Sequence, residues 1–272
     1  MFSLFAAYAH STWLVTASFI AGVMNAMAGG GSFVSFPAML AMGVAPIQAN
    51  ATNTVALWPG QLASVAKLRD DLRKDLLPVV ILTSILGGVG GALILLRTRQ
   101  TTFLHLVPWL LLVATLLFGL SGPVSNHLRQ RALARAIAED REHIPNATPA
   151  MLPLFLILLP VCVYIGYFGA GAGFLIMSAL ALFGVEEMHQ LNSLKVLAAC
   201  LSNLCAVITF VASGAVMWRY CVLSMLFCGV DGYLGAHYAR RINPRVLRLI
   251  VVATGCAVAG YFFWKNAQGD PL

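Results

Sequence analysis

Long apolar segments alternate with short polar connections along this chain, and the pattern limits its fold more than any motif does. A transmembrane helix needs about 20 consecutive apolar residues. Only 10% of the 272 residues are charged and 60% are apolar, so charged side chains are too few to cover a water-soluble domain of this size. The sequence therefore predicts an all-α polytopic membrane protein. It argues against a cytosolic enzyme, a nucleic-acid-binding domain and a disordered chain. The apolar segments are 4–28, 32–44, 48–66, 76–96, 102–120, 151–168, 173–185, 190–212, 217–236 and 246–264.

The ten segments fall into two sets of five. Residues 1–120 form the first predicted repeat, 121–150 a basic cytoplasmic linker, and 151–272 the second repeat. The second segment of each set is the shortest and would cover under about 20 Å as a helix, whereas a bilayer core is about 30 Å thick. The sequence thus predicts eight full spans plus two short helices, each of which follows a glycine-rich break.

Matching residues recur in the same order in the two halves, which indicates an internal duplication. At an offset of 141 residues the glycine-rich runs align, and one extra residue in the next loop changes the offset to 142. The aligned pairs include Gly30 with Gly171, Phe33 with Phe174, Asn50 with Asn192, Asn53 with Lys195, and Gln61 with Asn203.

Basic residues gather in three connecting loops, at 67–75, 121–150 and 237–248. Loops rich in Lys and Arg usually mark the cytoplasmic side of a membrane, so these clusters predict membrane topology rather than a nucleic-acid-binding surface. Each half then crosses the membrane five times, an odd number. The two halves therefore have opposite orientations, as inverted repeats in a bacterial inner membrane, and both termini are predicted to be periplasmic.

A glycine-rich run precedes each short segment. Gly29, Gly30, Gly31 and Ser32 belong to the first run, and Gly171 and Gly173 belong to the second. Such a run frees backbone N–H groups, and a helix N-terminus carries partial positive charge, so the two together favour anions. Paired short segments in inverted repeats are typical of a transporter site near the bilayer midplane. The alternative is that the glycines only let helices pack closely.

Polar residues concentrate in the third segment of each half. Such residues are costly in lipid and tend to face the protein interior, so several of them on one helix face favour a cavity. The alternative is that each amide forms a helix–helix hydrogen bond. The candidate substrate-binding residues here are Asn25, Asn50, Thr52, Asn53, Asn192 and Asn203.

Two charged residues are placed inside spans. Lys195 would attract an anion at the cavity and repel cations, unless it pairs with Asp231 or extends to the interface. Asp231 is a candidate to carry a coupling proton. We expect H⁺ rather than Na⁺ as the coupling ion, because few acidic residues are available to surround Na⁺.

Several motifs in this chain resemble the TauE/SafE family of permeases. The first repeat carries Asn25–Ser32, Phe36-Pro37 and Ala51–Thr54. The second carries Phe168–Gly173 and Phe210–Trp218, followed by Gly232–Ala236 before Arg240-Arg241. The resemblance covers nearly the whole chain. It implies a secondary carrier of sulfite, sulfonates or related small sulfur-containing anions. By motif position, the resemblance implies that the substrate site includes Asn25, both glycine runs, Thr52, Asn53 and Lys195.

The sequence thus predicts a secondary transporter of a small anion, sulfite or an organosulfonate, that works by alternating access. No HExxH, GxSxG or P-loop motif occurs, and we expect no enzyme activity, cofactor or metal. The expected partners are the anion, the lipid bilayer and the coupling ion. Three alternatives are an uncoupled anion channel, a membrane scaffold without transport, and a sulfur-handling protein that uses Cys200 or Cys205.

Overall fold

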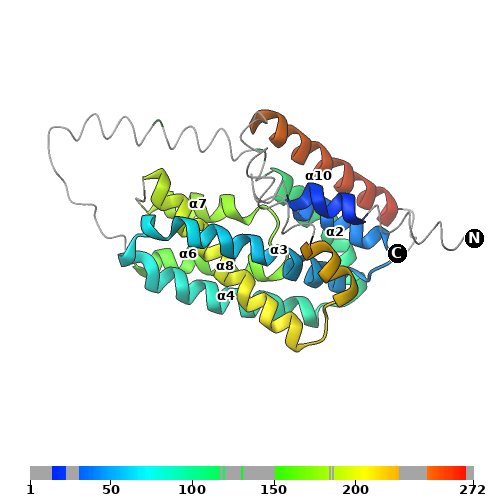
Figure 1. The fold of residues 1–272 in the computed structure, drawn as a ribbon, viewed down its shortest axis with the longest axis horizontal. Coiled ribbons are helices and arrows are strands. Elements are labelled where there is room, and N and C mark those ends of the chain that lie inside the picture. Colours follow the sequence, from blue (N-terminus) through cyan, green and yellow to red (C-terminus); the bar gives the residue numbers. More distant parts are fainter. Residues whose placement is uncertain are drawn as a thin grey trace, which may run out of the picture.

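The computed structural model describes residues 14–22, 31–116, 151–183, 187–226 and 244–267, together with positions 119, 130 and 185. Every regular element in these ranges is a helix (Figure 1). The α-helices are α2 (Ser32–Ala41), α3 (Pro46–Leu68), α4 (Leu77–Arg97), α6 (Met151–Tyr167), α7 (Ala172–Leu182), α8 (Met188–Ala212) and α10 (Pro244–Ala267). Further helices cover 14–22, Gln100–Leu116 and 218–226, and short 3₁₀ helices cover Arg69–Asp71 and Lys74–Leu76.

The helices agree with the expectation of an all-helical membrane protein. Within the described residues, two stretches are long and apolar enough to cross a membrane, Lys74–Arg97 and His189–Ala212, against the eight full spans expected from the whole sequence. The helices α2 and α7 are short, as the sequence predicted. Helix α2 begins directly after the first glycine-rich run, and α7 begins at Ala172 within the second run, so that Gly173 lies in its first turn. Proline at the first or second helical position, where no backbone N–H is needed, begins both α3 and α4.

The two sides of α4 differ in a way that is typical of a membrane helix. Its outer side presents large apolar side chains at helical spacing, and Leu82 and Ile94 there are 50% and 52% exposed. Its inner side carries small residues that are buried, among them Ser84, Gly87 and Gly91. A helix with large apolar groups outside and small groups inside is suited to lipid around it and to close contact with its neighbours.

Glycines bring α4 close to α6 and α8. A Cβ atom at Gly87 would lie 2.7 Å from the backbone carbon of Cys162, and one at Gly91 would lie 2.7 Å from the backbone nitrogen of Tyr167. On the other flank, a Cβ atom at Gly88 would lie 2.9 Å from the Cα atom of Ser202. These distances leave no room for a side chain, so the three helices form the tightly packed base of the molecule, where they run side by side (Figure 1).

The connecting loops gather at two opposite ends of the α3–α8 pair. At the beginning of α3, the backbone N–H of Ile47 donates to Gln100, which follows the loop after α4. The loop after α8 reaches the same end, where the backbone N–H of Met217 donates to Thr52. At the opposite end, Ser193 near the start of α8 donates to the Asp71 carbonyl oxygen. Loops 97–101 and 213–216 therefore lie at one end of the helices, and loop 67–75 lies at the other.

The α4 packing gives the first testable prediction. Gly91→Ala should lower the stability of the purified protein by about 1–3 kcal/mol, because the added methyl group overlaps the backbone of α6. Gly90→Ala is the matched control, since no atom lies within 4 Å of a Cβ at that position. Thermal unfolding in detergent measures both, and equal melting temperatures for the two variants would contradict the packing described.

Candidate functional site

The first candidate cluster surrounds the start of α2. Ser32 begins the helix, and Asn53 of α3 donates from Nδ2 to the Ser32 hydroxyl oxygen at 3.1 Å. The buried hydroxyl of Ser35 lies 3.0 Å from the Gly31 carbonyl oxygen and also contacts Oδ1 of Asn53. A helix leaves its first N–H groups without intrahelical partners. The cluster therefore joins the start of a helix to uncharged hydroxyl and amide groups.

The second cluster surrounds the turn between α6 and α7. Gly169 and Gly171 have φ angles of +75° and +72°, a region that side chains other than glycine rarely adopt. The Tyr164 hydroxyl donates to the Ala170 carbonyl oxygen at 2.7 Å, and Asn50 of α3 donates from Nδ2 to the Tyr167 carbonyl oxygen at 3.0 Å. Two side chains from different helices thus hold this turn in its shape.

The turn also has no space to spare. A Cβ atom at Gly171 would lie 2.9 Å from the Ala114 carbonyl oxygen. One at Gly169 would lie 3.1 Å from the Ile165 carbonyl oxygen and within ordinary contact distance, 3.7 Å, of Oδ1 of Asn203. Asn203 itself donates to Gln61 of α3 at 2.9 Å. The glycines here therefore serve both close packing and the turn geometry, so the close-packing alternative describes part of their role.

Lys195 differs from the other polar residues of the two clusters. Its aliphatic chain crosses Gly173 in the first turn of α7, where a Cβ atom would lie 3.3 Å from Cδ of the lysine. The side chain is partly buried. Among the residues that the structure describes, it has no ion pair and no hydrogen-bond partner. An unpaired ammonium group beside a helix N-terminus can attract an anion.

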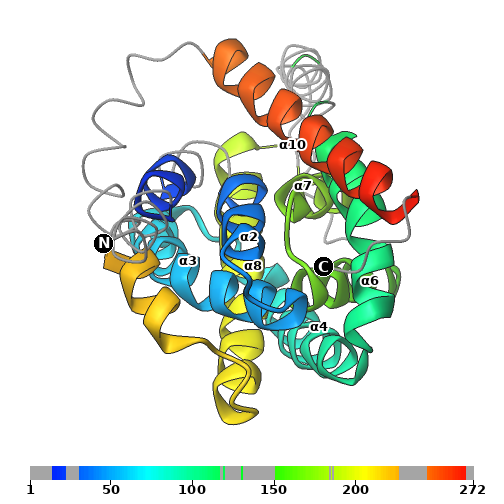
Figure 2. The same cartoon turned by 90° about the vertical axis from the view of Figure 1, so that its right-hand side faces the viewer.

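The two clusters lie next to each other. Asn50 and Asn53 are one turn apart on α3. Asn50 contacts Tyr167 at the end of α6, two residues before the second glycine run, and Asn53 contacts the start of α2. The Phe36 and Phe168 rings meet edge to face with centroids 5.7 Å apart, which joins α2 directly to the turn before α7. Figure 2 shows α2 between α3 and α7 in the middle of the helices.

The sequence-predicted residues have different surroundings in the structure. Thr52 accepts a hydrogen bond from the backbone N–H of Met217, at the end of the molecule where loop 213–216 lies. Asn192 lies partly buried in the first turn of α8. Asn50 and Asn203 both form the helix–helix hydrogen bonds considered as the alternative. The candidates outside the described residues are Asn25, Gly29, Gly30 and Asp231.

Sequence reasoning missed two residues that shape these clusters. Ser35 is surrounded by apolar residues in a short segment, and nothing in the sequence distinguishes it from a packing residue. Tyr164 lies in an apolar helix, where a tyrosine is usually taken as a lipid-facing or core side chain. Its position six residues before the carbonyl that it contacts was a weak signal, because only the turn geometry brings the two together.

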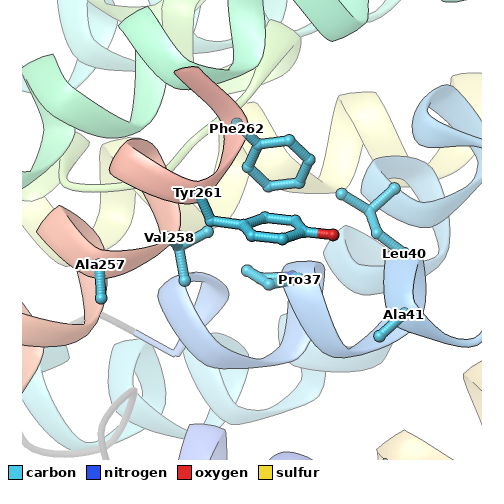
Figure 3. Close-up of a pocket in the computed structure, with 7 residues that line it drawn as sticks. All are labelled: Pro37, Leu40, Ala41, Ala257, Val258, Tyr261 and Phe262. Atoms are coloured by element: carbon cyan, nitrogen blue, oxygen red, sulfur yellow. The ribbon is translucent and has the colours of Figure 1, made fainter. Parts of the chain in front are cut away.

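A cavity of about 300 Å³ lies between α2 and α10, away from both clusters (Figure 3). The Tyr261 ring extends across Pro37, and the remaining lining groups are apolar. The lining residues are Pro37, Leu40, Ala41, Ala257, Val258, Tyr261 and Phe262. With one hydroxyl as its polar side-chain group, this cavity does not suit a small anion. Within the described parts of the chain, no three His, Cys, Asp or Glu side chains are grouped to hold a metal ion.

The fold and the exposed apolar helix faces define a helical membrane protein, and comparison with known proteins gives its family. The sequence matches the family described as sulfite exporter TauE/SafE over residues 14–262. The chain therefore belongs to the TauE/SafE family. No solved structure matches the chain.

Several relatives match along most of their length. The probable membrane transporter protein ORF9 of Sinorhizobium sp is 29% identical, with 91% of this chain and 90% of that protein covered. The probable membrane transporter protein YfcA of Escherichia coli K12 is 25% identical, with 91% and 87% covered. A probable membrane transporter protein of Haemophilus influenzae is 24% identical, with 88% and 89% covered. These names indicate a membrane transporter and not an enzyme.

The Tyr164 contact gives the second prediction. Tyr164→Phe should destabilise the protein by about 1 kcal/mol, because the Ala170 carbonyl oxygen loses its donor in the protein interior. Tyr261→Phe is the control, since the Tyr261 ring is half exposed and its hydroxyl makes no hydrogen bond to a described residue. Melting temperatures in the same detergent compare the two. A loss of stability in Tyr261→Phe equal to that in Tyr164→Phe would show that the hydrogen bond to Ala170 does not stabilise the protein.

Proposed function

We propose that this protein is a secondary transporter that moves a small anion, sulfite or an organosulfonate, across the bacterial inner membrane by alternating access. The observation that carries the proposal is the position of Lys195 beside the first turn of α7, where it forms no ion pair or hydrogen bond with any described residue. Membership of a family described as sulfite exporters supports the choice of anion. The proposed site comprises both glycine runs with Ser32, Asn53 and Lys195, and Asn25, Asn50, Thr52, Asn192 and Asn203 complete its polar surroundings.

The proposed anion lies between the two short helices. Each N-terminus supplies backbone N–H groups and partial positive charge. Lys195 adds a full charge on the side of α7, and the hydroxyl of Ser32 and the amide of Asn53 add donors on the side of α2. Charged and neutral donors around one oxyanion form the kind of charge-assisted hydrogen bonds that are stronger than neutral ones.

Two contacts support the proposed inverted repeat. Trp58 donates to the Cys200 carbonyl oxygen, and Asn203 donates to Gln61. Each pair is separated by 142 residues, which equals the offset between the two halves in this region. Equivalent residues meet each other only where a two-fold axis passes between them. The proposed axis therefore passes between α3 and α8, with residues 1–120 and 151–272 as the repeats and 121–150 as the linker.

A second pair of contacts supports the same two-fold relation between the two halves. Met217 donates to Thr52 at one end of the α3–α8 pair, and Ser193 donates to Asp71 at the other end. In both cases, the third helix of one half contacts, near its start, the segment that leads into the fourth helix of the other half. The basic clusters of the sequence orient this arrangement, with loop 67–75 and the linker in the cytoplasm and both termini in the periplasm.

The proposed mechanism is rocking of one repeat against the other around the fixed site. The hydrogen bond from Asn50 to Tyr167 crosses between the halves and is a contact that such rocking would remake. A proton is the proposed coupling ion. Asp231 is its proposed carrier, since it is the acidic residue that the sequence places within a span.

Lys195 gives the third prediction. Lys195→Gln should weaken binding of sulfite about tenfold or more, because a charge-assisted hydrogen bond to the anion is lost. Lys67→Gln is the matched control, an exposed lysine in the last turn of α3. Ligand-dependent melting temperatures of the purified proteins report the affinity, because a ligand that binds only the folded state stabilises it. Unchanged sulfite affinity in a folded Lys195→Gln protein would refute the proposed site.

The coupling proposal gives the fourth prediction. In proteoliposomes, an imposed pH gradient should drive sulfite against its concentration gradient, and Asp231→Asn should abolish this accumulation while downhill exchange of sulfite continues. The measurement is the concentration of sulfite inside the proteoliposomes, with and without a protonophore. Accumulation that persists in Asp231→Asn would exclude this residue as the proton carrier, and downhill flux indifferent to the gradient would favour a channel.

A further inference from the structure

We propose that the cavity between α2 and α10 holds one acyl chain of an anionic phospholipid, whose phosphate group is bound by Lys265. The cavity lies away from the two polar clusters, so the proposal does not depend on which anion is transported. Three observations carry it. They are the apolar lining of the cavity, a lysine one turn beyond that lining, and the exposed aromatic rings beside the lysine.

The cavity reaches the outer surface of the molecule. Two of its lining residues on α10, Ala257 and Tyr261, are exposed, and α10 itself lies across the outside of the other helices (Figure 2). The outer surface of a membrane protein of this kind faces the hydrocarbon chains of lipids. A cavity of about 300 Å³ with an apolar lining gains dispersion contacts when such a chain lies in it.

The lining residues of α10 form a stripe that leads to Lys265. Ala257, Tyr261 and Lys265 are spaced four residues apart, so they follow one another along the same face of the helix. Figure 3 shows the Tyr261 ring extending from α10 across Pro37 of α2. Lys265 lies one turn beyond that ring, in the last turn of α10. An acyl chain in the cavity therefore brings its headgroup to this lysine.

The charge at this end of the cavity complements an anionic headgroup. Lys265 forms no ion pair or hydrogen bond with a described residue. Neither of the two helices that line the cavity contains an aspartate or a glutamate. A lysine ammonium group has three donors and no acceptor, so it suits a phosphate oxygen. A lipid with a net negative headgroup is attracted here more strongly than a zwitterionic one.

Aromatic side chains place Lys265 at the level of the lipid headgroups. Tyr261 and Trp264 are 50% and 60% exposed, and their rings lie beside each other. Exposed Tyr and Trp are enriched at the membrane–water interface, and lysines near helix ends extend toward it. The helix rises about 12 Å from Ala257 to Lys265, while one leaflet contributes about 15 Å of the hydrocarbon core. The stripe therefore matches one chain of one leaflet.

The test compares phospholipids that have the same acyl chains and different headgroups. Thermal unfolding of the delipidated protein in detergent is followed with increasing dioleoylphosphatidylglycerol or dioleoylphosphatidylcholine, because a ligand that binds only the folded state stabilises it. The anionic lipid should reach half-maximal stabilisation at about fivefold lower concentration, the effect of one lysine on one headgroup charge. Glycerol 3-phosphate, which has the phosphate without the chains, should not stabilise the protein at these concentrations.

Two variants with matched controls test the residues themselves. Lys265→Gln should remove the preference for the anionic lipid, whereas Lys67→Gln, at an exposed lysine in the last turn of α3, should keep it. Ala257→Phe fills the cavity and should weaken binding of both lipids about tenfold, because the chain loses its dispersion contacts. Ala253→Phe, at an exposed alanine of α10 that does not line the cavity, should leave both affinities unchanged.

Each part of the proposal can be overturned separately. Equal stabilisation by the two lipids, or a preference for the anionic lipid that persists in Lys265→Gln, overturns the assignment of the headgroup. Unchanged lipid affinity in Ala257→Phe overturns the assignment of the acyl chain. Stabilisation by glycerol 3-phosphate as strong as that by the anionic lipid overturns lipid binding and indicates a site for free phosphate. Sulfite binding is tested by Lys195→Gln, so the failure of one proposal leaves the other standing.

Discussion

Close contact between α4 and the backbones of α6 and α8 is the constraint on which the other features depend. Lipid offers no hydrophobic gain for bringing two apolar helices together, so contact area at short range has to hold them. Glycines supply that contact at Gly87, Gly88 and Gly91. Because α6 leads into the turn before α7 and α8 carries Lys195 and Asn203, the glycine contacts of α4 place the second glycine run beside the lysine.

Most polar side chains near the two glycine runs are already engaged in holding them. Asn50 and Tyr164 satisfy carbonyl oxygens of the turn before α7, and Asn53 and Ser35 brace the start of α2. A polar group left unsatisfied in an apolar medium is costly, so these bonds fix the breaks in the helices. Lys195 is the charged side chain of this region, and it forms no ion pair or hydrogen bond with a described residue.

The helices could be predicted because their signals lie within each segment. Apolar length, prolines at the starts of α3 and α4, and glycines before α2 and α7 act locally, and the observed bounds differ from the expected ones by a few residues. The contacts of Ser35 and Tyr164 could not be predicted, since each depends on where a backbone carbonyl turns. Asn53 and Lys195 could be singled out from the sequence because they occupy matching positions, whereas the partners of Asn53 could not be predicted.

In the proposed inverted repeat, the contact between Gln61 and Asn203 has a consequence for how such a fold can be built from two copies of one sequence. A side chain on a two-fold axis meets its own counterpart, so it must complement itself. Two lysines or two carboxylates would repel each other there, and two aliphatic groups would give no orientation. An amide both donates and accepts, which makes Asn and Gln suited to the axis. Positions away from the axis, such as Asn53 and Lys195, do not need to complement themselves. Only at such positions can the two halves carry different charges.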